Sequence, residues 1–306
     1  MFRRQRRLFT RHRRAKSSTL LLIVGAVGLA AVVVAVVMVT RDGAQVGAIH
    51  DPGPVHIHAL GINPRDDALF LASHTGLYRI GKGDDVARRV SDRRQDTMGF
   101  TVVAADRFLG SGHPDLRDEL PPRLGLIQSR DGGKKWTPIS LLGKADFHVL
   151  RAHRPQVVAY DASSGRVFVS RDRGKHWRAH RFGGPLVDLV IAPNQPRMLL
   201  ATSPAQLLLS RDGGRSWGSL VETSGLLAWP KPRQLYLLAP DGQLWLSPDR
   251  GRRWRRLGEV GGHPAAFAAY ADGRMYAALH EGIIKRSTDG GRSWRVLART
   301  ESAQTR

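Results

Sequence analysis

The 306-residue sequence contains no cysteine, which excludes disulfide bonds and thiolate metal sites. It also lacks a convincing helical periodicity after residue 55. From there the chain consists of short apolar or alternating runs separated by turn residues, which is the pattern of β-strands. We therefore expect an all-β fold, and the chain is long enough to bury a sizeable hydrophobic core.

Acidic residues are also in short supply. There are 26 Asp and Glu against 48 Lys and Arg, and the formal net charge is +22. Residues 1–49 hold nine of the basic residues and one acid, so the rest of the chain carries +14. Such a charge ordinarily indicates nucleic acid as a partner, unless the arginines simply cover a solvated surface.

The N-terminal segment helps to decide whether this charge indicates a nucleic acid partner. Residues 1–19 are strongly basic, and residues 20–39 are twenty uncharged residues, long enough to cross a bilayer core of about 30 Å as a helix. The basic flank predicts a cytoplasmic N-terminus and places everything after Arg41 outside. A cleavable signal peptide is the alternative, although its apolar region would be shorter. We expect a single-pass anchor in the cell membrane, a flexible linker over residues 40–54 and no nucleic acid partner.

One phrase occurs five times in the remaining chain, with the pattern Ser-x-Asp-x-Gly-x-x-Trp. Its aspartates are Asp131, Asp172, Asp212, Asp249 and Asp289, and its tryptophans are Trp136, Trp177, Trp217, Trp254 and Trp294. A repeat near 40 residues indicates one supersecondary unit stacked on copies of itself. In such a phrase, Asp and Ser accept backbone hydrogen bonds, Gly adopts positive φ, and Trp buries a large ring against the neighbouring unit.

Each unit contains four short predicted strands, with the phrase as the turn between the third and fourth. Residues 147–181 show the unit most clearly, and residues 56–92 form a further unit in which the phrase has decayed. Six units predict a single β-propeller of six four-stranded blades over residues 55–298, with a tail over residues 299–306. Seven blades is the alternative if two units have been merged. Whole blades should meet where the ring closes.

The phrase matches the Asp-box, or BNR repeat, and residues 55–298 resemble the Asp-box β-propellers. That family includes sialidases, xyloglucan-cleaving glycosidases, sortilin-type receptors and photosystem II assembly factors. The whole layout also resembles membrane-anchored bacterial proteins labelled glycosylhydrolase. The resemblance implies that the boxes lie at the blade periphery and are structural, so it supports the fold rather than catalysis.

The boxes also orient the ring, because a site at the channel mouth should lie on the opposite rim. Six of the twelve histidines map to that rim and are the predicted ligand-binding residues: His56, His58, His74, His113, His148 and His280. With nearby carboxylates they could form an acid/base cluster or hold a divalent metal, for which His74, His113 and His280 are the candidates. The alternative is that they are ordinary hydrogen-bonded residues.

Carboxylates on the same rim raise the question of catalysis. Glycoside hydrolysis needs two positioned carboxyl groups, or in sialidases a tyrosine paired with a carboxylate. The rim carboxylates are Asp115, Asp118, Glu119, Asp146 and Glu281, and the catalytic candidates among them are Asp115, Asp146 and Glu281. Sialidase chemistry is disfavoured, because the sequence has no Arg-Ile-Pro near the start of the propeller and no evident set of three arginines. An insertion over residues 114–123 lies on the same rim, and long loops often carry function.

Two functions follow from this rim. We favour a membrane-tethered ligand-binding or assembly platform that recognises an anionic glycan, a lipid surface or a protein through its histidines. The alternative is a glycoside hydrolase of non-sialidase chemistry acting on an envelope or extracellular glycan. Two carboxylates facing each other across a pocket would favour the hydrolase, whereas a histidine cluster would favour binding.

Overall fold

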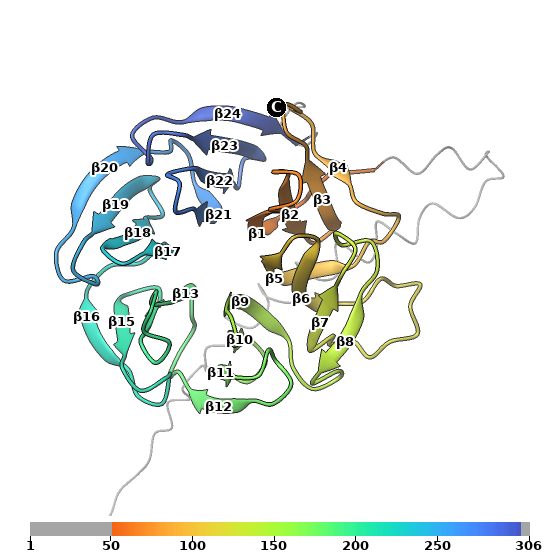
Figure 1. The fold of residues 1–306 in the computed structure, drawn as a ribbon, viewed down its shortest axis with the longest axis horizontal. Coiled ribbons are helices and arrows are strands. Elements are labelled where there is room, and N and C mark those ends of the chain that lie inside the picture. The colour runs from red at the N-terminus through yellow and green to blue at the C-terminus, as the bar shows by residue number, and fades with distance from the viewer. Residues whose placement is uncertain (1–50, 301–306) are drawn as a thin grey trace, which may run out of the picture. The chain divides into compact units, whose positions relative to one another are not determined.

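The computed structural model describes residues 51–300, which form a closed ring of six four-stranded antiparallel sheets (Figure 1). This confirms the prediction of an all-β propeller, with six blades rather than seven. The predicted cytoplasmic segment and membrane anchor lie outside the described residues, as do most of the linker and of the C-terminal tail. Among residues 51–300, no helix is long and apolar enough to span a membrane.

Each blade is a meander of four strands that follow one another in the sequence. Blade 1 contains β1 (Ile57–Ile62), β2 (Leu69–Ser73), β3 (Gly76–Ile80) and β4 (Arg88–Arg89). Blade 2 contains β5 (Asp96–Ala104), β6 (Arg107–His113), β7 (Leu126–Ser129) and β8 (Thr137–Ser140). Blade 3 contains β9 (Phe147–His153), β10 (Gln156–Asp161), β11 (Arg166–Ser170) and β12 (Arg178–Arg181).

The second half of the ring repeats this arrangement. Blade 4 contains β13 (Asp188–Ile191), β14 (Leu199–Thr202), β15 (Leu207–Ser210) and β16 (Gly218–Val221). Blade 5 contains β17 (Leu226–Lys231), β18 (Gln234–Leu238), β19 (Gln243–Ser247) and β20 (Arg255–Glu259). Blade 6 contains β21 (Pro264–Ala269), β22 (Met275–Leu279), β23 (Ile283–Ser287) and β24 (Arg295–Arg299).

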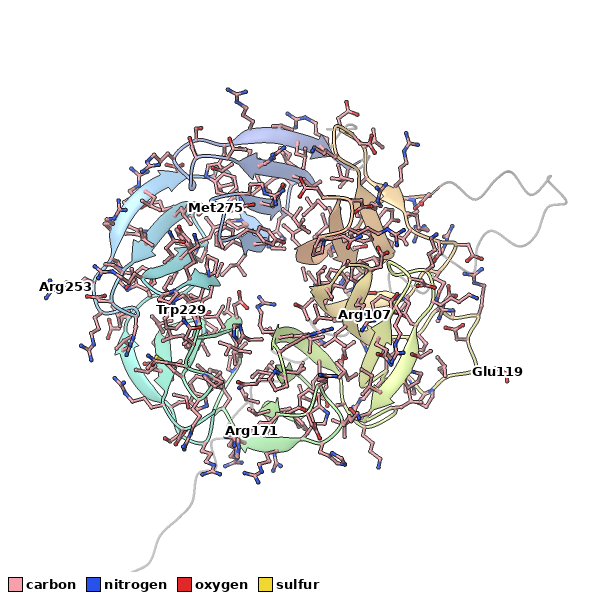
Figure 2. The ribbon with its side chains drawn as sticks, in the orientation of Figure 1. Arg107, Glu119, Arg171, Trp229, Arg253 and Met275 are labelled. Carbon is pink, nitrogen blue, oxygen red and sulfur yellow. The ribbon has the colours of Figure 1, made fainter. Side chains whose placement is uncertain are left out.

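The first strand of every blade lies innermost and contacts the first strand of the next blade, and β21 contacts β1 (Figure 1). Because each sheet is made of consecutive strands, the ring closes whole blade against whole blade, as predicted. The fourth strands lie at the outer edge. Figure 2 shows Arg253 at this edge, and Glu119, from the loop between β6 and β7, also at the periphery away from the channel.

The repeated phrase forms the turn between the third and fourth strands of blades 2 to 6. In all five boxes the Ser Oγ lies 2.8–3.0 Å from the Asp Oδ1. The same Ser Oγ accepts a hydrogen bond, at 2.7–2.9 Å, from the backbone N–H of the glycine that lies two residues after the Asp. Each carboxylate also accepts from backbone N–H groups beyond it, as Asp289 does from Arg292 and Ser293 at 3.0 Å. These local bonds make the boxes structural turns.

The hydrophobic core consists of six clusters, one at each interface between neighbouring blades. At five of the interfaces the box tryptophan packs between its own blade and the preceding one. Trp177 of blade 3, for example, donates from Nε1 to the Ser140 Oγ of blade 2 at 2.9 Å. The box tryptophans therefore join the blades, as the sequence predicted.

The interface between blades 6 and 1 has no box tryptophan, because the phrase has decayed in blade 1. Other contacts hold this closure. The Tyr270 hydroxyl accepts a hydrogen bond from the Ile62 N–H at 2.7 Å, and Arg274 pairs with Asp67.

Candidate functional site

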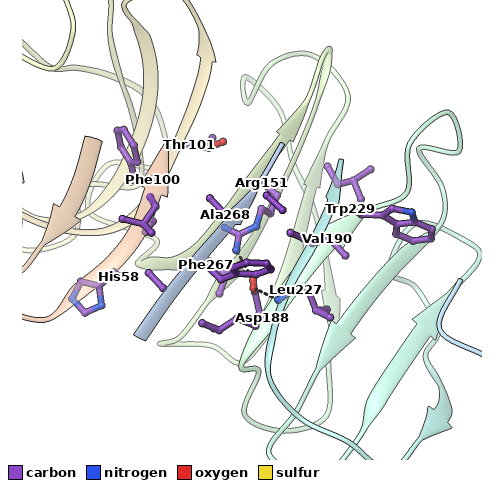
Figure 3. Close-up of a pocket in the computed structure, with 18 of the residues that line it drawn as sticks. His58, Phe100, Thr101, Arg151, Asp188, Val190, Leu227, Trp229, Phe267 and Ala268 are labelled. Carbon is purple, nitrogen blue, oxygen red and sulfur yellow. Dashed lines mark hydrogen bonds and ion pairs between the residues drawn. The ribbon is translucent and has the colours of Figure 1, made fainter. Parts of the chain in front are cut away.

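The central channel forms a cavity of about 500 Å³ lined by the first strands of all six blades (Figure 3). Its wall combines apolar side chains such as Phe100 and Phe267 with a few polar ones, including His58, Arg151 and Asp188. A cavity of this size and mixed lining is typical of ligand-binding sites.

Asp188 is buried in the channel wall, and both of its oxygens are engaged (Figure 3). Its Oδ1 lies 2.6 Å from Arg151 Nη2 and accepts from the Leu189 N–H at 2.7 Å, while Oδ2 accepts from the Leu227 N–H at 2.8 Å. Burial raises the pKa of Asp188, whereas Arg151 and the two amides lower it. Because these contacts join blades 3, 4 and 5, Asp188 stabilises the ring.

Histidine and aspartate side chains form a network at one mouth of the channel. The rings of His56 and His58 stand edge-on to His74, with centroids 5.3 and 4.4 Å from its centroid. His74 Nδ1 lies 2.9 Å from Oδ1 of Asp96, and His113 Nδ1 lies 3.2 Å from Oδ2 of the same carboxylate. Asp96 therefore joins blade 1 to blade 2.

Asp146 extends this network to blade 3. Its Oδ2 lies 2.9 Å from His148 Nε2 and 3.7 Å from His113 Nε2. Burial acts to raise the pKa of Asp146, but the hydrogen bond with His148 and the charges of His148, His113 and Arg123 together outweigh it, so the pKa is lowered. Five of the six predicted histidines thus lie in one cluster, which we call the rim network: His56, His58, His74, Asp96, His113, Asp146 and His148.

Strand pairing explains why these side chains converge. In an antiparallel blade the start of the first strand lies beside the end of the second. Asp96 at the start of β5 is the register partner of His113 at the end of β6. In blade 1, Ile57 pairs with Ser73, which places His56 and His74 at the same end of the sheet.

Two atoms of the rim network, His58 Nε2 and Asp146 Oδ1, are buried without a hydrogen-bond partner among residues 51–300. Buried polar atoms are rarely left unpaired, because the lost hydration costs about 1–3 kcal/mol each. Burial, followed by the charge of His74, lowers the pKa of His58 to about 4. The His58 imidazole is therefore neutral at neutral pH, the form that accepts a hydrogen bond or binds a metal.

The remaining predicted residues lie outside the rim network. His280 follows β22, and its backbone N–H donates to the carbonyl of His263 at 2.9 Å. Glu281 pairs with His263 instead, at 2.6 Å. The structure therefore brings His74 and His113 to one carboxylate but does not bring His280 to them.

Asp115 is buried and holds the inserted loop of blade 2. Its oxygens accept from the Arg117 side chain at 2.7 and 2.9 Å and from the Arg94 N–H at 2.7 Å. The hydrogen bonds from Arg117 hold the pKa of Asp115 well below its usual range. Arg93 also pairs with Asp118. With every acceptor direction used, Asp115 is placed for loop structure and not for proton transfer.

The inserted loop exposes apolar side chains on the same rim. Leu116 is fully exposed, at 102% of its reference area, and Leu120 is 40% exposed. The ion pairs at Asp115 and Asp118 hold the backbone on both sides of Leu116. The loop thus presents a leucine to solvent from an ordered base.

No protein-family model matches this chain, and no curated protein matches it. Solved structures do resemble it. YCF48 from Cyanidioschyzon merolae is 17% identical over 80% of this chain and 85% of that chain, with a TM-score of 0.50. YCF48 bound to D1 peptide is 18% identical over 81% and 84%, with a TM-score of 0.51. A GH74 xyloglucanase from Xanthomonas campestris is 17% identical over 81% and 46%, with a TM-score of 0.52. At such identities the likeness is one of fold.

Sequence reasoning missed Asp96, which two of the predicted histidines share. A signal for it was present in the sequence. Asp96 is the first residue of the first strand of blade 2, and His56 and Asp146 immediately precede the first strands of blades 1 and 3. Asp188 and Arg151 were missed as well. The two residues are 37 positions apart in the sequence, and no local pattern indicates that they pair.

Proposed function

We propose that this chain is a non-catalytic binding platform, held outside the cell membrane by its N-terminal anchor, that binds a protein partner on its histidine-bearing rim. The observation that carries this proposal is the rim itself. A network of five histidines and two aspartates lies at the channel mouth across blades 1 to 3, and the inserted loop of blade 2, held to Arg94 through Asp115, exposes Leu116 on the same rim. Ordered polar groups beside an exposed apolar anchor are the composition of a protein-binding surface.

The channel supports a binding role over glycoside hydrolysis. Among the described residues that line it, the one carboxylate is Asp188, and its contacts with Arg151 and two amides occupy both oxygens. A hydrolase needs a second carboxylate about 5–10 Å away, facing the first across the sugar. Of the three predicted catalytic acids, Asp115 is held by Arg117 and Glu281 by His263.

The likeness to YCF48 supports the same choice. One of those solved structures contains a D1 peptide, so a propeller of this fold binds a peptide segment. For this chain we propose a protein segment as the partner, in preference to an anionic glycan or a lipid surface. The rim supplies imidazoles, carboxylates and an exposed leucine, a mixture of polar and apolar groups that suits a protein segment.

Purification of the full chain from its native membranes tests this proposal. We expect a protein to co-purify with wild type in a fixed ratio and to be lost, by at least tenfold, with Leu116→Asp. Val296→Asp is the matched control, since Val296 is an exposed apolar residue on the outer strand of blade 6, at 47% exposure. Equal recovery from the two variants would contradict a partner on the rim.

Glycoside hydrolysis remains the competing function, and one observation favours it: Asp146 is a mostly buried carboxylate at the channel mouth with an unpartnered oxygen. A panel of fluorogenic glycosides tests it. We expect no turnover above a heat-denatured sample. Turnover by wild type that is abolished in Asp146→Asn would replace the binding function with a hydrolase.

A further inference from the structure

We propose that His58, His74 and Asp96 form a binding site for a divalent transition-metal ion of the zinc type. Each side chain offers one ligand atom, and these three atoms lie within 4.8 Å of one another. They come from two blades: His58 from β1, His74 from the end of β2, and Asp96 from the start of β5. This inference goes beyond the proposed function, because the ion would bind the chain with no partner present.

The buried Nε2 of His58 is the independent observation that points to a ligand. It is inaccessible to solvent and has no hydrogen-bond partner among residues 51–300. In one of its two tautomers, a neutral imidazole carries at Nε2 the lone pair that binds a metal ion. The adjacent His74 ring stands edge-on at 4.4 Å and so brings a second imidazole to the same place. A metal ion bound between the two rings would satisfy this nitrogen.

The donor set selects the class of metal. Two imidazoles and one carboxylate suit zinc, nickel, copper or iron, whereas magnesium and calcium prefer oxygen ligands alone. Zinc binds such ligands at about 2.0–2.2 Å, which places them about 3.3 Å apart in a tetrahedral site. The ligand atoms must therefore move together from separations of up to 4.8 Å. His74 can supply this movement by side-chain rotation, since its side chain is 41% exposed.

The rest of the rim network acts as support for these ligands. The second oxygen of Asp96 faces His113, and His113 in turn faces Asp146, which is fixed by His148. Hydrogen-bonded partners of this kind orient metal ligands and raise affinity. Three protein ligands leave a fourth position open on a tetrahedral ion. That position could accept water or a side chain of a bound protein.

Calorimetric titration of the full chain, purified in detergent, freed of any affinity tag and treated with a chelator, tests this site. We expect one Zn²⁺ per chain, and one Co²⁺ whose visible absorption reports imidazole and carboxylate ligands. His74→Ala and Asp96→Asn should each lower affinity by at least tenfold, about the loss seen when a metal site is disturbed. Thermal unfolding followed by circular dichroism confirms that each variant is folded.

His263→Ala is the matched control. His263 lies 2.6 Å from Glu281, as an exposed histidine–carboxylate pair outside the rim network. Its variant should bind both metals as tightly as wild type. Binding of less than one ion per chain would overturn the proposal, as would equal losses in the control and in His74→Ala. Strong binding that depends on His113 but not on His74 would overturn this choice of ligands. Each of these results leaves the protein-partner proposal to its own test.

Discussion

Asp96 and Asp146 hold the rim histidines together, because each contacts two imidazoles from different parts of the chain. A cluster of histidines alone would repel on protonation and would have no fixed geometry. The two carboxylates supply both the charge and the positions of the rings. Three of the five rim histidines, His74, His113 and His148, are therefore held by aspartates.

Replacing Asp188 with alanine should strongly destabilise the propeller. The change leaves the Arg151 guanidinium and two buried N–H groups without their acceptor, and breaking one side of a buried ion pair costs about 3–5 kcal/mol. Urea unfolding followed by tryptophan fluorescence measures this loss. The control Asp85→Ala, at an exposed loop residue, should change the free energy of unfolding by less than about 0.5 kcal/mol. Comparable losses in both would show that Asp188 has no special role.

The individual residues were only partly predictable from the sequence. Five of the six histidines could be placed on one rim because the box turns fixed the direction of every strand. The carboxylate that pairs with each histidine could not be predicted, because the distances between side chains of neighbouring blades depend on how tightly blades 1, 2 and 3 pack. His280 illustrates this: it ends its strand in the same way as His74, yet it lies outside the rim network. Asp115 was on the predicted rim but is held by Arg117.

The Asp-box turns depend on glycine at one position for space as well as for conformation. Gly290 and Gly291 both have positive φ, of 74° and 88°. A Cβ on Gly291 would lie 2.1 Å from Leu244 Cδ2 in blade 5, whereas one on Gly290 would meet nothing within 4 Å. Leu244 is fully buried and has little room to move. The absence of a side chain at Gly291 therefore allows blades 5 and 6 to pack this closely.

Alanine substitutions at these two glycines separate conformation from packing. Gly290→Ala should cost about 1–2 kcal/mol, the strain of a left-handed alanine. Gly291→Ala should cost about 1–3 kcal/mol more, because it also overpacks the interface with blade 5. Chemical denaturation of both variants and wild type measures the difference. An equal cost for the two substitutions would show that blade packing does not constrain the box.

The Asp-boxes should also make the propeller acid-sensitive. Hydrogen bonds from Ser216 and Ser293 to the Asp212 and Asp289 carboxylates, with backbone N–H bonds, hold their pKa values well below the ordinary range. A carboxylate with a depressed folded-state pKa stabilises the fold above its unfolded pKa of about 3.9, and that stability is lost as pH falls toward the folded-state pKa. We expect the free energy of unfolding to fall between about pH 5 and pH 3.

Urea unfolding at these two pH values measures the effect. Asp289→Asn cannot titrate at this position, so its stability should fall less than that of wild type over the same interval. Stability that is unchanged or higher at about pH 3 would contradict the role given to the box carboxylates.

The six four-stranded blades could be predicted from the sequence, because the box turn occurs five times and the strand pattern six times. The decayed phrase of blade 1 was recognised from its strands alone, and its loss has a structural consequence. Without a box tryptophan, the last interface of the ring relies on Tyr270, Arg274 and the aliphatic cluster around Leu69 and Leu71. This replacement depends on contacts between the two ends of the ring, which no local pattern reveals.

For the chain as a whole, we predict that residues 20–39 anchor the protein in the membrane with its C-terminal part outside the cytoplasm. The basic residues before this apolar run favour that orientation. Full-length protein should remain with membranes after a carbonate wash, while a chain lacking residues 1–41 should be soluble. A reporter enzyme that works only outside the cytoplasm, fused to the C-terminus, should be active. Retention of the shortened chain on membranes would contradict an anchor in this segment.

The boxes build the ring, and we propose that a protein partner binds the opposite rim. Site-specific photo-crosslinking in living cells tests it most directly, with the reactive amino acid placed at Leu116 on the rim or at Arg253, exposed in the box of blade 5. We predict one discrete crosslinked protein from position 116 and none from position 253. A crosslink from position 253 alone would place the partner on the box side and contradict the account.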